Sequence, residues 1–300
     1  MSQNGSSCFK VLSLALPKGS LEEQTMLLFK QAALDVKVGF RDYNPSISDP
    51  RISKVKILRP QEIPKYVEEG YFDVGISGLD WITESEADVE VIADMPYSKQ
   101  GSGIVRLVIA VPDSSKIERP EDIKPQSRVT TEFLNITKKY FEGLGIPVEV
   151  YYSYGASEAK VPELMDVVID LTETGATLRQ NHLKIIGTVL ESSTKLIANK
   201  KSWRNKKKRK AIEEIKTLLL GVLEARGKVL LGMNVSKKAL KGVISILPAM
   251  KNPTVSKLYN SDYYALETVV PKKDVNVLIP KLKEKGAEDI IEMDITKIVK

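Results

Sequence analysis

Cysteine and histidine are almost absent from this chain of 300 residues, which contains one of each, Cys8 and His182. A single cysteine permits no intrachain disulfide and no cysteine-rich zinc site. A single histidine excludes metal sites built from several histidines and argues against a histidine-based catalytic triad. For His182, a place at a helix end or on the surface is a better interpretation than catalysis. Cys8, near the N-terminus, is interpreted as incidental.

Long apolar runs are also lacking, since none reaches the roughly 18–20 residues that a membrane span requires. The first ten residues, MSQNGSSCFK, have neither the charged region nor the apolar region of a secretory signal. We therefore expect a cytoplasmic protein without a membrane partner. With 42% hydrophobic and 28% charged residues, the composition is typical of a globular chain of two or three domains.

Basic residues are in excess, but the excess is local. Residues 200–210, KKSWRNKKKRK, contain eight basic and no acidic side chains, so subtracting 8 from the net charge of +6 leaves −2. Only Trp203 interrupts the run, which gives little for nucleic-acid bases to stack on. We expect a solvated lysine face and no nucleic-acid partner. Contact with nucleic acid, or help in binding a nucleotide triphosphate, is the alternative.

Strand-like and helix-like segments alternate along the first two thirds of the chain, which predicts an α/β fold with mainly parallel sheets. Strands are expected at 10–16, 55–58, 74–77, 105–111, 148–152 and 167–171, and helices at 61–69, 137–144 and 176–181. Ser20 and Glu23 have the spacing of a capping box, which predicts that another helix starts there. Residues 200–226 read as one long helix with an apolar stripe, ended by Gly227.

Two turns follow expected strands and lead into expected helices. The first is 17–20, PKGS, and the second is 172–177, TETGAT, directly after the run VVIDL. In the second turn, backbone N–H groups and the hydroxyls of Thr174 and Thr177 could surround a phosphate. Asp170, at the end of the strand, could bind sugar hydroxyls. The competing interpretation is a capped helix beside a buried aspartate, and spacing alone leaves both open.

From Lys228 onward the pattern restarts as strand, helix, strand, strand, helix and strand. This βαββαβ order is typical of a ferredoxin-like module. It contains no glycine-rich phosphate turn and no clustered acid–base pair. We therefore expect a regulatory or assembly domain.

Four segments resemble the ATP phosphoribosyltransferase family. They are PKGSL after the first strand, ILRPQEIPKYVEEGYFDVGISGLDW at 57–81, RVTTEFLNITKKYF at 128–141 and EAKVPELMDVVIDLTETGATL at 158–178. The tail from Ala225 resembles the regulatory domain of the long form of that enzyme. The resemblance covers about residues 9–299.

The resemblance implies a two-lobed core like that of periplasmic binding proteins, followed by a ferredoxin-like regulatory domain. Lobe I would comprise 1–100 and 187–225, lobe II 101–186 and the regulatory domain 226–300. The chain would cross between the lobes near 98–104 and 183–188. The implied reaction joins ATP and phosphoribosyl pyrophosphate (PRPP) into N1-(5-phosphoribosyl)-ATP and pyrophosphate, the first step of histidine biosynthesis, with Mg²⁺ and with histidine as feedback inhibitor. Adenine N1 is already a nucleophile, so this chemistry needs positioning and electrostatics rather than a strong base.

The resemblance also implies three sets of site residues, in a chain that assembles into homodimers and homohexamers. The PRPP set is Glu158, Asp170, Thr172, Thr174, Gly175, Ala176 and Thr177. The ATP set is Lys18, Gly19, Arg59 and Gly78. The histidine set is Asn234, Met250, Asn252, Thr254, Val269 and Asp289.

Two departures from the family pattern bear on these sets. Ser20 stands where many members have arginine, so Lys18 or a neighbouring base would have to compensate. Asn234 stands where a relative has aspartate, which makes Asp289 the candidate acid. Three other functions compete with the enzyme: a two-lobed binding protein, a catalytically silent regulatory paralogue, and a nucleic-acid-binding protein using 200–210.

Overall fold

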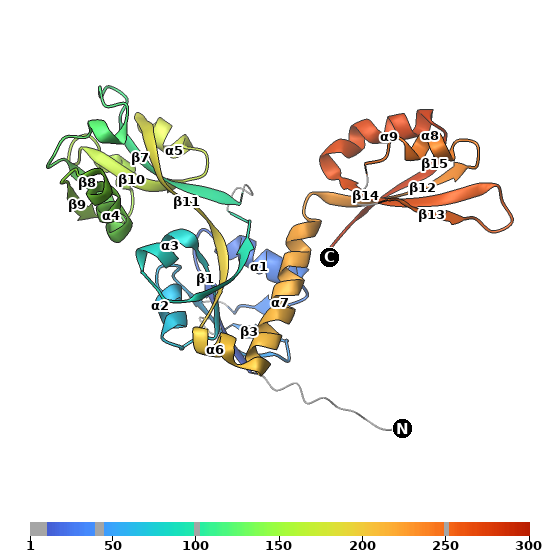
Figure 1. Cartoon of the computed structure of the whole chain (residues 1–300), viewed down its shortest axis with the longest axis horizontal. Helices are drawn as coiled ribbons and strands as arrows, with labels where there is room; N and C mark the ends of the chain where they lie inside the picture. The colour runs from blue at the N-terminus through green and yellow to red at the C-terminus, as the bar shows by residue number, and fades with distance from the viewer. Residues whose placement is uncertain (1–10, 40–44, 99–102, 249–251) are drawn as a thin grey trace. The chain divides into compact units, whose positions relative to one another are not determined.

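The computed structural model describes residues 11–39, 45–98, 103–248 and 252–300 (Figure 1). The chain forms two compact units, Met1–Lys216 and Thr217–Lys300. The boundary falls inside helix α7 (Lys206–Ala225), so each unit is described by itself. Among the described residues, every helix is too short or too polar to cross a membrane.

The first unit is built on a nine-stranded sheet with the order β4-β1-β5-β11-β7-β10-β8-β9, in which β6 also pairs with β11. The strands are β1 (Leu12–Pro17), β4 (Ile52–Leu58), β5 (Val74–Gly78), β6 (Glu90–Met95), β7 (Ile104–Pro112), β8 (Arg128–Thr131), β9 (Glu149–Tyr152), β10 (Val167–Thr172) and β11 (Leu183–Ala198). Pairing is parallel in β4-β1-β5 and in β10-β8-β9, and antiparallel around β11 and between β7 and β10. The α/β class is confirmed, and the parallel pairing holds for the two outer parts of the sheet. A separate hairpin joins β2 (Val36–Lys37) and β3 (Ser46–Ile47).

Strand β11 divides the sheet into two lobes, because its first part pairs with β7 and its last part with β5 and β6 (Figure 1). It stays on β7 as far as Ser193 and changes partners at Thr194. The return crossing therefore comes later in the chain than the predicted 183–188. Of the other predicted crossing, 98–104, residues 99–102 lie outside the described residues.

Four helices of the first unit lie close to where the pattern predicts them, the helix at 79–84 was not predicted, and two predicted details are wrong. They are α1 (Glu22–Gln31), α2 (Ile63–Glu68), α3 (Leu79–Glu84), α4 (Leu134–Leu144), α5 (Ala176–Gln180) and α6 (Lys200–Arg204). The predicted capping box is wrong, because α1 begins at Glu22, whose carboxylate accepts the N–H of Gly19 at 3.2 Å. The predicted single helix over 200–226 is also wrong, because the extended Asn205 separates α6 from α7.

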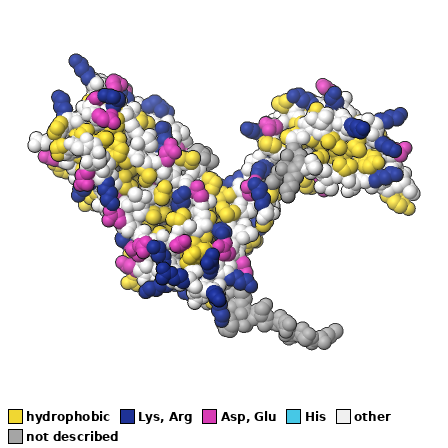
Figure 2. All heavy atoms as spheres, in the orientation of Figure 1, with side chains coloured by type: hydrophobic (Ala, Val, Ile, Leu, Met, Phe, Trp, Pro, Cys, Tyr) yellow, Lys and Arg dark blue, Asp and Glu magenta, His cyan; other side chains and the backbone are white. Residues whose placement is uncertain are grey.

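Side-chain capping explains the break at Asn205. Asn199 accepts N–H groups of the first turn of α6, and Asn205 accepts the N–H groups of Lys207 and Lys208 at the start of α7. Such caps satisfy donors that have no partner inside the helix. Figure 2 shows the Lys and Arg side chains gathered over α6 and the start of α7.

The two lobes touch where α3 meets α4. The rings of Trp81 and Phe133 lie 4.4 Å apart. The carboxylate of Glu84 accepts the N–H groups of Asn135 and Ile136, at 2.9 and 3.0 Å, at the start of α4. A carboxylate at this end of a helix is favoured by the helix dipole. These contacts close one side of the cleft between the lobes.

The second unit is a four-stranded antiparallel sheet with the order β13-β14-β12-β15. Its elements are β12 (Lys228–Ser236), α8 (Leu240–Ile244), β13 (Thr254–Lys257), β14 (Tyr263–Pro271), α9 (Val275–Glu284) and β15 (Ala287–Asp294). Alternate residues of β12, from Val229 to Val235, are buried with residues of α8 and α9. This order and connectivity confirm the predicted ferredoxin-like fold. The predicted division into lobe I, lobe II and a domain from 226 stays a prediction.

Candidate active site

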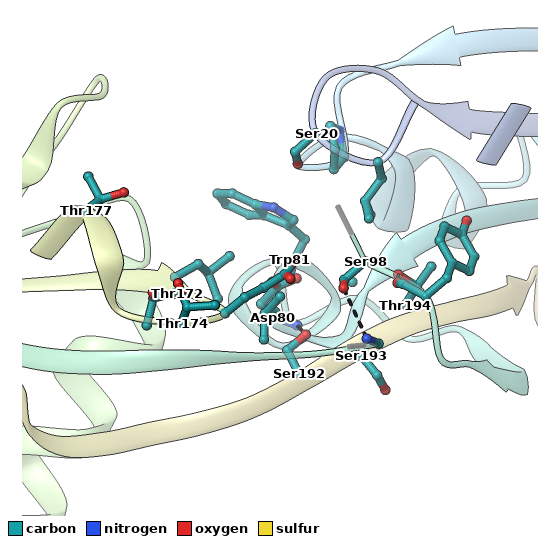
Figure 3. A pocket seen from close by; sticks show the side chains of 18 of the residues that line it. Ser20, Asp80, Trp81, Ser98, Thr172, Thr174, Thr177, Ser192, Ser193 and Thr194 are labelled. Atoms are coloured by element: carbon teal, nitrogen blue, oxygen red, sulfur yellow. Dashed lines mark hydrogen bonds between the residues drawn. The ribbon is translucent and has the colours of Figure 1, made fainter. Parts of the chain in front are cut away.

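A cavity of about 360 Å³ lies between the lobes, in the cleft that Trp81 borders (Figure 3). Lobe II contributes five residues of the 172–177 turn, which are Thr172, Glu173, Thr174, Ala176 and Thr177. Lobe I contributes residues of two turns and of α3, which are Ser20, Gly78, Asp80 and Trp81. Tyr97, Ser98, Ser192 and Thr194 come from the segments that join the lobes. The site is therefore assembled from segments far apart in the sequence.

A second hollow of about 190 Å³ continues the first, because both are lined by Ser20, Pro60, Trp81 and Leu171. It also holds Lys18, Gly19 and Arg59 of lobe I and Glu132 and Asp170 of lobe II. The structure thus brings Asp170 and the 172–177 turn into one cleft with Lys18 and Arg59, the two basic residues of the predicted ATP set. It shows where these side chains lie, while their roles stay predictions.

The turn at 172–177 is ordered by its own threonines. The hydroxyl of Thr172 accepts the N–H of Gly175 at 2.7 Å, and the hydroxyl of Thr174 accepts the N–H of Ala176 at 3.3 Å. Gly175 is buried and has φ +72°, a conformation that favours glycine. A Cβ there would meet Arg179 and Ile185 at 3.0 and 3.2 Å. Gly175 shapes the turn, while Thr174, Ala176 and Thr177 face the cavity.

Asp170 lies in the second hollow without a basic partner among the ion pairs of the described residues. Its pKa is raised to about 6, mainly by burial and also by the charges of Glu158 and Glu132, against hydrogen bonds from Leu171 N–H and Ser157 that lower it. Leu171 N–H donates at 2.7 Å. A buried carboxyl offset only by neutral donors is suited to a ligand that brings hydroxyls or positive charge.

Glu158 is close enough to act on Asp170 through its charge, in the short helix Ser157–Lys160. It is not among the residues that line either hollow in the described part of the chain. Its predicted contact with PRPP therefore has less geometric support than that of Asp170. Glu132, which the sequence analysis did not single out, does line the second hollow, and burial raises its pKa.

The predicted ATP residues lie on lobe I at the ends of three neighbouring strands. Lys18 and Gly19 follow β1, Arg59 follows β4, and Gly78 ends β5. Gly19 has φ +89°, and a Cβ there would lie 4.0 Å from Nη1 of Arg59, so the guanidinium lies over this turn. Ends of parallel strands are the usual ligand edge of an α/β sheet.

Asp80 is a site residue that sequence reasoning missed as such. It is only 4% exposed, it lines the larger cavity, and its carboxylate accepts the N–H of Trp81 at 2.7 Å. Burial raises its pKa to about 6, against hydrogen bonds from Trp81 N–H, Ser192 and its own N–H. From the sequence alone, Asp80 is interpreted as an ordinary turn residue, and its burial appears only in the fold.

His182 follows α5, is exposed, and has φ +55°. Its N–H donates to the carbonyl of Arg179, and its own carbonyl accepts the N–H of Asp113. The interpretation as a surface residue at a helix end is confirmed.

The predicted histidine-site residues of the second unit share one face of its sheet, opposite α8 and α9. Asn234 alternates with the buried residues of β12, Val269 alternates with those of β14, and Thr254 pairs with Glu267 on that same face. Asp289 has φ +49° at an irregularity of the β12–β15 pairing, and its carboxylate accepts a hydrogen bond from Asn234 Nδ2 at 2.9 Å. Asn252 lies two residues before β13 along the chain. Met250 lies outside the described residues.

A resident metal site has no obvious ligands in the described segments, which contain no group of three His, Cys, Asp or Glu side chains able to hold an ion.

Comparisons with known proteins agree with this geometry. The family model described as HisG, ATP phosphoribosyltransferase, matches residues 59–221, and that of the HisG C-terminal domain matches 225–297. An ATP phosphoribosyltransferase of Pelotomaculum thermopropionicum is 49% identical over 96% of this chain and 99% of its own. One from Thermodesulfovibrio yellowstonii is 46% identical over 97% and 99%.

Among solved structures, the ATP phosphoribosyl transferase (HisG:HisZ) complex from Thermotoga maritima matches with a TM-score of 0.60 and 28% identity. The match covers 70% of this chain and 99% of that one. With nearly full-length relatives close to half identical, and a family model matching each part of the chain, this protein belongs to the ATP phosphoribosyltransferase family, in the long form that carries the C-terminal domain.

Proposed function

We propose that the cleft between the lobes transfers the phosphoribosyl group of PRPP to N1 of ATP, the first step of histidine biosynthesis, in the cytoplasm. The observation that carries this proposal is the meeting of the 172–177 turn, Asp170, Lys18 and Arg59 in two continuous hollows. PRPP and ATP are both phosphate-rich, so a shared site needs a phosphate turn on one wall and bases on the other.

In this proposal lobe II holds PRPP. The 5-phosphate sits on the turn, where Thr174 and Thr177 face the cavity and Thr172, Gly175 and Ala176 set the backbone. Asp170 accepts hydrogen bonds from the ribose hydroxyls. Glu158 adds negative charge to the region that receives the ribose without lining the cavity, and the same charge raises the pKa of Asp170.

Lobe I holds ATP. Lys18 and Arg59 neutralise its phosphates, and Gly19 lets the Arg59 guanidinium lie close to the turn. Lys18 and Arg59 also supply positive charge beside Ser20, where many relatives have arginine. Gly78 leaves a flat wall, since a Cβ there would lie 2.1 Å from the Asp80 carboxylate.

The chemistry is a displacement at C1 of the ribose. The lone pair of adenine N1 forms the new bond, while the bond to pyrophosphate breaks and its electrons leave with the oxygen. No proton has to be removed from the nucleophile, so orientation and charge stabilisation supply the catalysis. The negative charge of Asp170, in a site of low dielectric constant, stabilises the positive charge that develops on the ribose.

Mg²⁺ fits this arrangement as an ion carried by PRPP. It keeps several waters and is usually held by one or two carboxylates and by substrate phosphates. Glu132 and Asp170 line the smaller hollow and could hold the waters of the ion. When bound, the ion neutralises charge on the leaving pyrophosphate.

The second unit is proposed to bind histidine as inhibitor, through Asn234, Asn252, Thr254, Val269 and Asp289, with Met250 as a further contact. Amide and hydroxyl groups suit a carboxylate, and Asp289 suits an amine. The chain would form homodimers and homohexamers. Histidine inhibits only if it binds one assembly state better than another.

The test of the transferase function is turnover. The full chain, mixed with ATP, PRPP and Mg²⁺, should give product with its rise in ultraviolet absorbance, along with stoichiometric pyrophosphate. Omitting PRPP is the control for ATP hydrolysis. Absence of product in a folded sample that binds both substrates would point instead to a silent paralogue.

The test of regulation is truncation after Ala225. The shortened protein should keep turnover that histidine does not inhibit, or lose turnover together with its assembly, as measured by light scattering. Undiminished inhibition by histidine would place the inhibitor site elsewhere. The substitution Asp289→Asn in the full chain tests the pocket without removing the domain.

A further inference from the structure

Asp80 is held in an unusual setting for a carboxylate. It is 4% exposed at the start of α3, yet it lines the cavity between the lobes (Figure 3). Its carboxylate accepts the N–H of Trp81 at 2.7 Å, and its backbone N–H donates to the Ser192 hydroxyl at 3.0 Å, so these partners are neutral. None of the ion pairs between described residues includes Asp80.

A buried carboxylate without a cation is costly, and neutral donors offset only part of that cost. The cost falls when a ligand in the cavity supplies a further donor or a positive charge. The fold holds the group firmly, because the carboxylate folds back over Gly78 so closely that a Cβ there would lie 2.1 Å from Oδ1. The missing partner is therefore expected on the cavity side.

We propose that Asp80 recognises adenine, accepting a hydrogen bond from its 6-amino group and stabilising the positive charge that the base acquires during transfer. This inference rests on the proposed function for the reaction, although recognition of adenine can be tested without turnover.

The surroundings of Asp80 favour a planar base over a sugar. Trp81, Leu21 and Tyr97 line the same cavity and offer apolar and aromatic surface. Trp81 is itself held in place against Phe133. Many hydroxyl groups also line this cavity, and Asp80 is the buried carboxylate that lies beside its aromatic and apolar surface. Apolar surface with a precisely placed polar group is a usual way to bind a planar ligand by its edge. Ribose hydroxyls are a competing partner, which the experiment separates.

The reaction gives Asp80 a second role. When the lone pair of N1 bonds to C1 of the ribose and pyrophosphate leaves with its electron pair, the adenine ring becomes a cation. That charge is shared between N1 and the 6-amino nitrogen through the intervening carbon. A carboxylate on the 6-amino group, ionised and shielded from water, interacts with this charge more strongly than with neutral ATP. Asp80 therefore acts on kcat as well as on binding.

The experiment compares ATP with purine riboside triphosphate, which lacks only the 6-amino group, by isothermal titration to the full chain. Wild type should bind the analogue about 10- to 100-fold more weakly than ATP. Asp80→Asn keeps an oxygen for Trp81 N–H and turns an amide N–H₂ toward the ligand. This variant should bind ATP more weakly than wild type does, and its dissociation constants for ATP and the analogue should differ by less than about threefold. It should also lower kcat more than it raises KM. Asp113→Asn, the same change at an exposed site of lobe II, should match wild type.

Equal affinity of wild type for the two nucleotides, within about twofold, would overturn the proposal without any variant being made. So would unchanged discrimination in Asp80→Asn, or discrimination that follows 2′-deoxy-ATP instead of the 6-amino group. Because these are binding measurements, a chain that discriminates but gives no product would refute the transferase function alone.

Discussion

Carboxylates that are buried or half-buried in the first unit fall into two kinds, which lie in different regions. At the base of lobe I, Asp73 accepts hydrogen bonds from Ser13 N–H and from the hydroxyls of Ser13 and Ser202, and pairs with Lys208. These partners hold its pKa below the ordinary value in spite of burial. In the cleft, burial raises the pKa values of Asp80 and Asp170 to about 6.

The difference lies in which partners the fold supplies. Around Asp73 the chain closes a complete set, and that set joins β1, β5 and the two helices α6 and α7. Around Asp80 and Asp170 it supplies neutral donors only. A charged group without a partner of opposite charge in the fold lowers the stability of that fold. Such groups are expected at ligand-binding sites, where the ligand supplies the partner. From this comparison we expect Asp73 to act in stability, and we propose substrate binding for the other two.

Removing Asp73 should have the largest effect. Asp73→Ala leaves Lys208, Ser202 and the N–H of Ser13 without their acceptor, so we expect a loss of about 3–5 kcal/mol in the free energy of unfolding. Urea denaturation at pH 7.5 measures it. The control is Asp94→Ala, because the Asp94 side chain is exposed although it bonds to Ser193 and pairs with Lys195, and its loss should cost about 1 kcal/mol or less. Equal losses of unfolding free energy in Asp73→Ala and Asp94→Ala would contradict the special role of Asp73 in stability.

Asp170→Asn should be the largest change in activity. The variant keeps the shape but loses charge-assisted bonds to the ribose and the field on the developing cation. We expect a loss of about 2–4 kcal/mol in transition-state stabilisation, which lowers kcat/KM roughly 30- to 1000-fold. Asp166→Asn, four residues earlier in an exposed pair with Arg128, is the matched control and should stay within about threefold of wild type. A fall of less than about threefold in Asp170→Asn would identify it as a structural residue.

The same substitution should stabilise the protein in a pH-dependent way. Folding raises the pKa of Asp170 from 3.8 to about 6, so the fold favours the neutral carboxyl. The resulting penalty is absent below pH 3.8, grows as the pH rises toward 6 and is complete above it. Two pKa units correspond to about 2–3 kcal/mol. Asp170→Asn should therefore be more stable than wild type at pH 7.5 and equal at pH 3.5, and a constant difference would contradict the sign.

Gly175→Ala should have the smallest of these effects on stability. The residue has φ +72° at the start of α5, and a Cβ would press on Arg179 and Ile185. We expect a loss of about 1–2 kcal/mol and a higher KM for PRPP, since the turn that carries Thr174 and Thr177 shifts. Gly143→Ala, where a Cβ would meet nothing within 4 Å, is the control and should leave KM unchanged. A raised KM in both variants would remove the link to the turn.

Much of the fold could be predicted from local pattern. The strands before the two turns, the 172–177 turn itself and the βαββαβ order of the second unit all follow from hydrophobic periodicity and turn residues. Strand β11 could not be predicted, because its residues face two lobes in succession and show no single alternation. The break at Asn205 was missed because the basic run continues across it, and only a side-chain cap marks the new start.

The site divides in the same way. Asp170 and the threonines lie in one short segment, so their chemistry is readable from the sequence. Lys18 and Arg59 come to Asp170 through the crossing of β11, which no local pattern encodes. Asp80 is defined by burial and by the absence of a cation among the described residues, and these are properties of tertiary packing.

The most direct test measures two quantities on two variants, Asp73→Asn and Asp170→Asn: the free energy of unfolding at pH 7.5 and the dissociation constant for PRPP. The account predicts opposite patterns. Asp73→Asn loses stability and binds PRPP within about twofold of wild type, whereas Asp170→Asn gains stability and binds PRPP about tenfold or more weakly. An Asp170→Asn protein that loses stability and keeps its affinity for PRPP would contradict the central claim.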